Sequence, residues 1–141
     1  MSPHIEEAWR ALGLADRDIH AFHVLKNDPE CHLSVVCFHA HQAIEKALKA
    51  VLFSRRIEFK RTHNLTELTS LLHQKGLETP VSDAQLLRLN PFAVTFRYDE
   101  MDIELVERED ASRWVTEIRE WAGNQIRAAA ETEEAHGADH D

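Results

Sequence analysis

A long helical pattern in the middle of the chain constrains the fold more than any other feature. Apolar residues recur at three- and four-residue steps from Leu33 to Leu52, and neither Gly nor Pro occurs between Glu30 and Asn64. This spacing places the apolar side chains on one wide face of a helix. A helix of about 27 residues is about 40 Å long and crosses a small domain from end to end. We therefore expect a central helix against which the rest of the chain packs.

Further helices are predicted on both sides of this segment. Helical spacing runs from residue 3 to residue 26, from 62 to 76, briefly after Thr79-Pro80, and from about 102 to 130. Residues 90–99 break the period with aromatic and β-branched residues and are expected to be irregular. The sequence thus predicts an all-α protein, an antiparallel bundle of four to five helices with an irregular segment before the last helix.

The length of 141 residues corresponds to one domain. We assign the bundle to residues 1–130. Residues 131–141 hold five acidic residues, no Lys or Arg and few apolar residues. Such a composition does not supply enough apolar surface for packing, so an acidic, disordered tail is expected there.

Charge is distributed unevenly along the chain. The net charge of −9 argues against unspecific adhesion to nucleic acids or membranes. Between Glu45 and Arg61, however, six Lys or Arg residues accompany two acids, a local balance of +4. Several of these cations follow the predicted end of the central helix, where the helix dipole is negative. A polyanion could bind at this end.

Cysteine usage and the N-terminal sequence predict a cytoplasmic protein. Cys31 and Cys37 lie six residues apart, nearly on opposite faces of a helix, so they are not expected to form a disulfide. The first residues are acidic where a signal peptide would be basic and then apolar. No apolar run is long enough to span a membrane.

Three motifs carry a resemblance to a known family. They are Gln42-Ala43-Ile44-Glu45-Lys46-Ala47-Leu48-Lys49, Arg61-Thr62-His63-Asn64-Leu65 and Phe96-Arg97-Tyr98-Asp99. Together they resemble the HEPN domain family over about residues 5–128, in particular the branch encoded beside minimal nucleotidyltransferases. The resemblance implies a helical bundle that forms a homodimer, associates with nucleotides or RNA, and often acts as half of a toxin-antitoxin pair.

Catalytic HEPN domains carry an Arg-x(4–6)-His motif that forms a metal-independent ribonuclease site between two subunits. Arg97 corresponds to the Arg of this motif, but no His follows at the required distance. Arg56 and His63 have six residues between them, in a different loop. An atypical ribonuclease could use His63 as a general base with Arg56, Arg61 or Arg97 stabilising the phosphate. Alternatively, His63 only fixes the start of a helix.

Candidate nucleotide- or RNA-binding residues are the cations and one aromatic residue of these motifs. Arg side chains hold phosphates and Tyr side chains stack on bases. The candidates are Lys46, Lys49, Lys60, Arg61, Arg97 and Tyr98. A plainer interpretation makes Lys49 the partner of Glu45 on a solvated helix face, and lets Phe96 and Tyr98 close the end of the bundle.

No metal or cofactor is expected, because the histidines do not show the spacing of a zinc site and the chain has no Gly-rich phosphate loop. The leading functional hypothesis is a nucleotide- or RNA-associated partner of a minimal nucleotidyltransferase. The alternatives are the atypical ribonuclease and a bundle that serves only dimerisation. The resemblance further suggests that the partner enzyme modifies Tyr98 by adenylylation.

Overall fold

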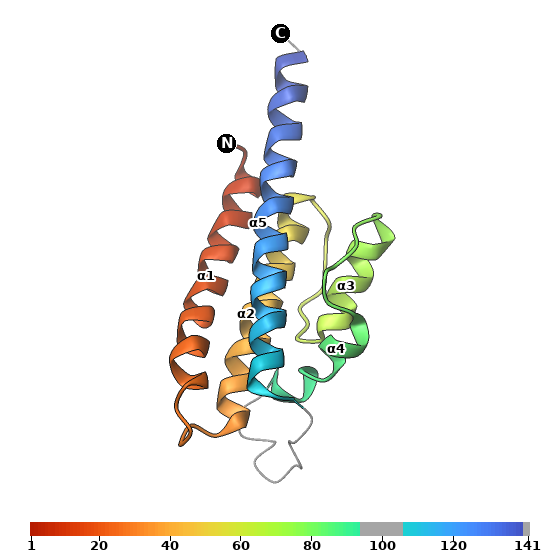
Figure 1. The fold of residues 1–141 in the computed structure, drawn as a ribbon. Coiled ribbons are helices and arrows are strands. Elements are labelled where there is room, and N and C mark those ends of the chain that lie inside the picture. The colour runs from red at the N-terminus through yellow and green to blue at the C-terminus, as the bar shows by residue number, and fades with distance from the viewer. Residues whose placement is uncertain (94–105, 140–141) are drawn as a thin grey trace.

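The computed structural model describes residues 1–93 and 106–139, and within them the chain is helical, without strands. Three long helices form the body of the molecule: α1 (Pro3–Lys26), α2 (Leu33–Ser54) and α5 (Arg108–Asp139) (Figure 1). Two short helices, α3 (Leu65–Gln74) and α4 (Asp83–Leu87), and the 3-10 helix η1 (Asn90–Ala93) lie on the other side of α2. The predicted all-α bundle is confirmed.

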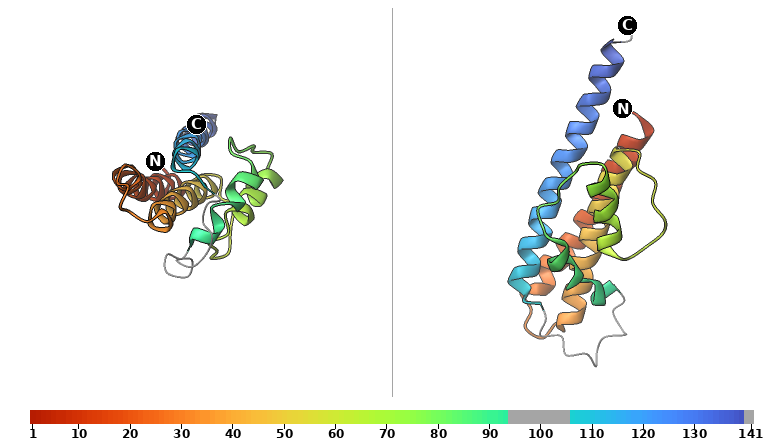
Figure 2. Two further views of the ribbon diagram at one scale, coloured as in Figure 1. Left: turned by 60° about the horizontal axis from the view of Figure 1, so that its bottom comes forward. Right: turned by 90° about the vertical axis from the view of Figure 1, so that its right-hand side faces the viewer.

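The connections determine the direction of the helices. A tight turn joins α1 to α2, so these two helices are antiparallel (Figure 2). The segment from α3 to η1 brings the chain back to the end where α2 begins, and α5 therefore runs in the same direction as α2. The bundle is antiparallel for α1 with α2 and for α1 with α5, but not for α2 with α5.

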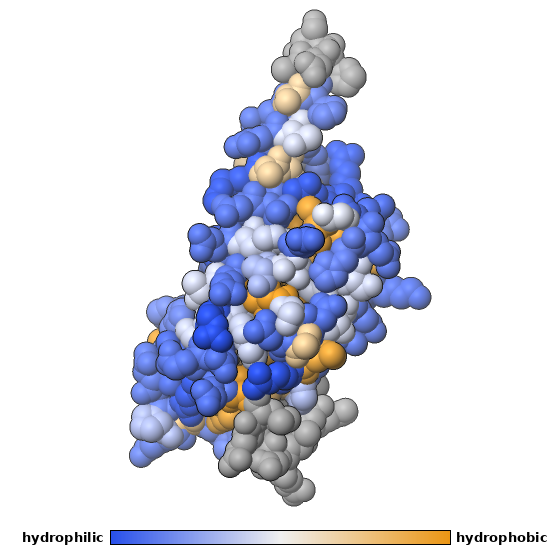
Figure 3. Space-filling model, turned by 45° about the vertical axis from the view of Figure 1, so that its right-hand side comes forward, coloured by the Kyte–Doolittle hydropathy of each residue, from blue (hydrophilic) through white to orange (hydrophobic). Residues whose placement is uncertain are grey.

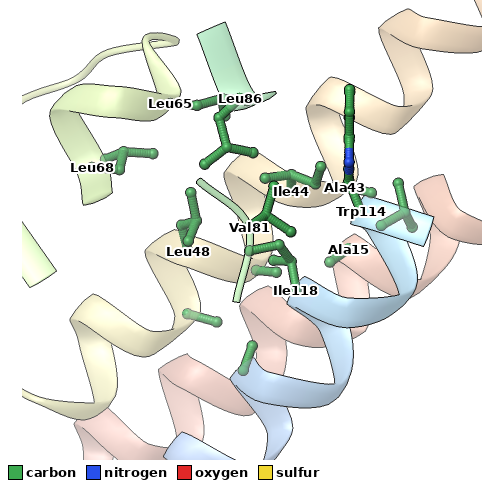
Figure 4. Close-up of a cluster of buried hydrophobic side chains, with 14 of the residues drawn as sticks. Ala15, Ala43, Ile44, Leu48, Leu65, Leu68, Val81, Leu86, Trp114 and Ile118 are labelled. Atoms are coloured by element: carbon green, nitrogen blue, oxygen red, sulfur yellow. The ribbon is translucent and has the colours of Figure 1, made fainter. Parts of the chain in front are cut away.

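Helix α2 is the centre of the core. It packs against α1, α3, α5 and η1. Ile44 and Leu48 of α2 meet Trp114 and Ile118 of α5 in a cluster to which the short helices also contribute (Figure 4). Ile44, Leu48 and Ile118 are fully buried, and truncating such a side chain to Ala costs about 2–5 kcal/mol.

The central helix is shorter than predicted: it has 22 residues rather than about 27. The imidazole of His32 caps its start by accepting a hydrogen bond from Ser34 N. Its end is set by Arg56, which has a φ of +56°. A residue in this left-handed conformation cannot continue a right-handed helix. The cations from Arg55 onward therefore follow the helix rather than extend it.

The first helix has the predicted bounds, whereas α3 and α5 begin later than predicted. Asn64 rather than Thr62 caps α3, since its side chain accepts a hydrogen bond from Thr66 N. Helix α5 begins at Arg108 rather than near residue 102. The Arg108 guanidinium donates hydrogen bonds to main-chain carbonyls of the turn between α1 and α2, among them Asp28 O at 2.9 Å. This contact fixes the start of α5 against that turn.

The division at residue 130 stays a prediction, but the segment expected to be disordered is helical as far as Asp139. Ala and Glu, which dominate residues 128–135, favour helix. Glu133 also contacts residues at the start of α1. None of the helices in the described part of the chain is both long and apolar enough to cross a membrane.

Candidate functional site

The segment that follows α2 turns back over the helix and exposes its cations. Arg55 caps α2, and Ile57 N donates a hydrogen bond to Leu52 O at 3.0 Å. Phe59 then packs edge-on against Phe53 of α2, with ring centroids 5.3 Å apart. Residues 57–64 thus leave the helix end along a path fixed by apolar contacts.

A groove of about 760 Å³ lies between this segment, α2 and the start of α1. Its apolar side chains are Phe53, Ile57 and Phe59, and its cationic or ionisable side chains are His4, Lys49, Arg56, Glu58 and Arg61. A second hollow of about 480 Å³ adjoins it, sharing Glu58 and Phe59, and is lined in addition by Lys60. The arrangement is an apolar floor surrounded mostly by cations.

Figure 3 shows one face of the molecule, which is mostly hydrophilic with apolar side chains in small separate patches. No extensive apolar surface is visible on the described part of this face. Small recesses bordered by charge suit a polar or charged ligand with an apolar or aromatic part.

The predicted binding residues Lys49 and Arg61 line the same groove. Lys49 Nζ lies 3.0 Å from Glu45 Oε2 and 5.9 Å from the centre of the Phe59 ring. Arg61 is exposed, and residues 1–93 and 106–139 offer it no hydrogen-bond or ion-pair partner. Arg61 is therefore available for an anion, whereas Lys49 is already paired with the Glu45 carboxylate.

Lys46 lies apart from this groove. Its Nζ is 2.5 Å from Asp18 Oδ2 of α1, and His39 Nδ1 is 3.2 Å from the other oxygen of the same carboxylate. The Asp18 side chain is only 14% exposed. Lys46 thus joins α2 to α1, and the Asp18 carboxylate already balances its charge.

His63 contacts a buried carboxylate rather than the predicted Arg56. Its Nδ1 lies 2.8 Å from Glu45 Oε1, and the Glu45 side chain is 5% exposed against 54% for His63. Arg56 instead contacts His4 and Glu133. His63 and Arg56 are therefore not paired with each other, and Lys60 borders the adjoining hollow.

A buried polar cluster lies behind His63. His41 is fully buried and its Nδ1 is 3.9 Å from Glu45 Oε1. Burial lowers the pKa of His41, against the charge of Glu45, which raises it. Its imidazole is therefore neutral at neutral pH. Asn90 completes the cluster by accepting a hydrogen bond from Leu65 N at 3.0 Å and donating one to Asn64 at 2.9 Å.

Sequence reasoning identified neither Glu45 as the partner of His63 nor the roles of His41 and Asn90. The spacing of His41 and Glu45, four residues apart, was a usable signal that both lie on one face of α2. Asn90 lies 26 residues beyond Asn64, and no local pattern connects them.

Comparison with known proteins decides the family. The family model described as "HEPN domain" matches residues 6–125. The chain belongs to the HEPN domain family. A crystal structure of an archaeal HEPN homologue is similar in fold, with a TM-score of 0.57, 22% sequence identity, and coverage of 84% of this chain and 97% of that chain. A search of curated proteins gave no match.

Arg97 and Tyr98 of this HEPN domain lie outside the described residues, so their predicted roles remain predictions. The elements on either side, η1 and the start of α5, lie at the end of the bundle where α2 begins (Figure 1). The groove lies toward the end where α2 stops. A site that combines the Arg97 segment with the groove of the same chain therefore has no support from the described residues.

The chemistry available in the groove is electrostatic. Over residues 1–93 and 106–139, no three His, Cys, Asp or Glu side chains are grouped so that they could hold a metal ion. Arg61, Lys49 and Arg56 can bind oxyanions, and Phe59 offers a ring to an aromatic ligand. His63, held by a carboxylate at one ring nitrogen, has its other nitrogen available for proton transfer.

Proposed function

We propose that the groove beside the end of α2 binds a nucleotide or single-stranded RNA, and that the protein acts as the partner of a minimal nucleotidyltransferase in a toxin-antitoxin-type pair. The single observation that supports this most is the convergence of Lys49, Arg56 and Arg61 on a groove floored by Phe53 and Phe59. Cations beside aromatic rings are the usual means by which proteins hold single-stranded nucleic acids without sequence preference.

Binding of a fluorescein-labelled single-stranded RNA, followed by anisotropy, tests the groove. Arg61→Ala removes a cation that makes no hydrogen bond or ion pair with the described residues, so it should change the charge of the groove without disturbing the fold. Loss of one phosphate contact should weaken binding about 3- to 10-fold and reduce the slope of log K against log salt by about 0.7.

Arg17→Ala is the matched control, because Arg17 is an exposed Arg of α1 that does not line the groove. It alters the net charge by the same amount, so its effect should be within a factor of about two. Equal effects of the two substitutions, or no binding by the wild-type protein at any salt concentration, would reject the groove as the binding site.

The partnership has a test of its own. The proposal predicts a minimal nucleotidyltransferase gene beside the gene of this protein. Co-expression of the two should give a complex that survives size-exclusion chromatography, and light scattering of the protein alone should give the mass of a homodimer. An intact-mass increase that disappears in Tyr98→Phe would support adenylylation of Tyr98. A monomer that does not co-purify with the enzyme would contradict the proposal.

The Glu45–His63 contact favours a second candidate, a metal-independent ribonuclease. A carboxylate bound to one imidazole nitrogen fixes the tautomer and directs the other nitrogen to act as base, here toward a ribose 2′-hydroxyl. Incubation of RNA with the protein in EDTA, compared with His63→Ala and Arg97→Ala, distinguishes the candidates. Cleavage that either substitution abolishes supports the ribonuclease. If the wild-type protein leaves the RNA intact, the ribonuclease is rejected and only the binding function remains.

A further inference from the structure

A carboxylate of the same chain contacts two of the side chains that line the groove. Glu133, on the last turns of α5, accepts a hydrogen bond from the Ser2 hydroxyl at 2.6 Å through Oε2. Its Oε1 contacts His4 Nε2 and lies 3.5 Å from Arg56 Nη2. Groups from the start of α1 and the end of α2 thus converge on one carboxylate.

Two of these three groups, His4 and Arg56, also line the groove. A carboxylate and a phosphate accept hydrogen bonds from the same donors. The Ser2 hydroxyl foremost, and then His4, hold the pKa of Glu133 below its usual value, so this side chain is ionised at neutral pH. Beside the groove, Glu133 therefore supplies an anion to two side chains that line it, His4 and Arg56.

The ion pair between Glu133 and Arg56 is exposed enough for a ligand to replace Glu133. The Arg56 side chain is 71% exposed and that of Glu133 is 32% exposed, so water screens their attraction. In Figure 1 the end of α5 extends beyond the start of α1. Residues 131, 132, 134, 135 and 136 are exposed, whereas Glu133 is half-buried and contacts the start of α1.

We propose that Glu133 is an intramolecular competitor for the anionic ligand of the groove, and that a ligand phosphate displaces it from His4 and Arg56. The proposal rests on the function proposed for the groove. It assigns a role to the acidic end of α5: Glu133 partly neutralises the edge of the empty groove, and only a ligand with a phosphate at this edge gains the contacts with His4 and Arg56.

The test measures binding of the full chain to a labelled single-stranded RNA of about ten nucleotides. Glu133→Gln removes the competing charge and should tighten binding about 3- to 10-fold. Glu131→Gln is the matched control, since Glu131 lies on the same helix, is exposed and has no partner in the described residues. It should change the affinity less than about twofold.

A third variant identifies the cation concerned. In Arg56→Ala, the anion site is already lost, so adding Glu133→Gln should no longer tighten binding. Circular dichroism of each variant checks that the bundle is folded.

The outcomes separate the two proposals. If wild-type binding depends on Arg61 but Glu133→Gln behaves like Glu131→Gln, the competitor role is wrong and the groove function stands. If Glu133→Gln tightens binding equally with and without Arg56, the competitor role is also wrong. If no variant binds RNA, both proposals fall.

Discussion

Replacing Glu45 with Gln tests how the polar cluster below the groove is held together. The substitution keeps the size of the side chain and removes the negative charge that joins Lys49 and His63. Glu45 is nearly inaccessible to solvent, with a side chain only 5% exposed, while its partners are 18% and 54% exposed. The two contacts therefore differ in how strongly water screens them.

The expected loss follows from these exposures. Hydrogen bonds to a charged group contribute about 1.5–3 kcal/mol when buried. Screening reduces the contact at 3.0 Å with Lys49 to about 1–1.5 kcal/mol, and the contact at 2.8 Å with the half-exposed His63 to about 0.5–1 kcal/mol. The sum is about 2 kcal/mol. An unfolding entropy of about 0.3 kcal/mol/K for 141 residues converts this to a fall in Tm of about 7 °C.

Urea and thermal unfolding followed by circular dichroism measure the change. Glu117→Gln serves as control, because Glu117 is exposed on α5 and has no partner in the described part of the chain, so it should stay within about 0.5 kcal/mol of wild type. A double-mutant cycle with Lys49→Met should give a coupling of about 1 kcal/mol. A loss of stability no larger than that of Glu117→Gln, or zero coupling, would show that Glu45 does not hold Lys49 and His63 in the cluster.

Three further predictions concern stability and reactivity. Burial raises the pKa of the Cys37 thiol to about 12, against the opposing charge of Arg108. In native protein at pH 8, a thiol reagent should therefore modify Cys31 rapidly and leave Cys37 unmodified. Equal rates for the two cysteines would contradict the burial of Cys37. Arg108→Met removes several hydrogen bonds to carbonyls of the α1–α2 turn and should cost about 2–3 kcal/mol in urea unfolding, and a change below about 0.5 kcal/mol would show that the turn does not depend on it. Burial lowers the pKa of His41, so below about pH 6.5 the unfolded state binds a proton that the folded state does not. The free energy of unfolding of the wild type should therefore fall more steeply with decreasing pH than that of His41→Gln, by up to about 1.4 kcal/mol per pH unit. Parallel profiles for these two proteins, with the exposed His20→Gln as control, would contradict this.

Periodicity predicted the helices well where one apolar face packs on the core. The bounds of α1 followed from Ser2-Pro3 and from the turn after Lys26, which are local signals. The end of α2 could not be read in this way. Helix-favouring residues continue past Ser54, and the helix stops because Arg56 adopts a left-handed conformation while Phe59 packs back on Phe53.

The sequence indicated where the groove lies, while the binding roles of its residues stay predictions. The cluster of cations after the central helix indicated the region of the groove, and Lys49 and Arg61 line it. Lys46 was grouped with them by motif, but the helix turns it toward Asp18 of α1. His4 could not be found from the sequence, since it lies 52 residues from Arg56 and is brought there only by the antiparallel pairing of α1 and α2.

The acidic end of the chain shows the same limit. Composition alone predicted disorder for residues 131–141, and it contained no sign that Glu133 would contact Ser2, 131 residues away. Such contacts depend on the length and direction of α5 relative to α1, which only the assembled bundle determines.

An NMR titration of the isotopically labelled protein with a short single-stranded RNA measures whether the groove beside the end of α2 is the binding site. Backbone amide shifts should change for Lys49, Phe59 and Arg61, while those of Arg17 on α1 stay in place. Shift changes centred on α1, or none at RNA concentrations far above those of the protein, would contradict it.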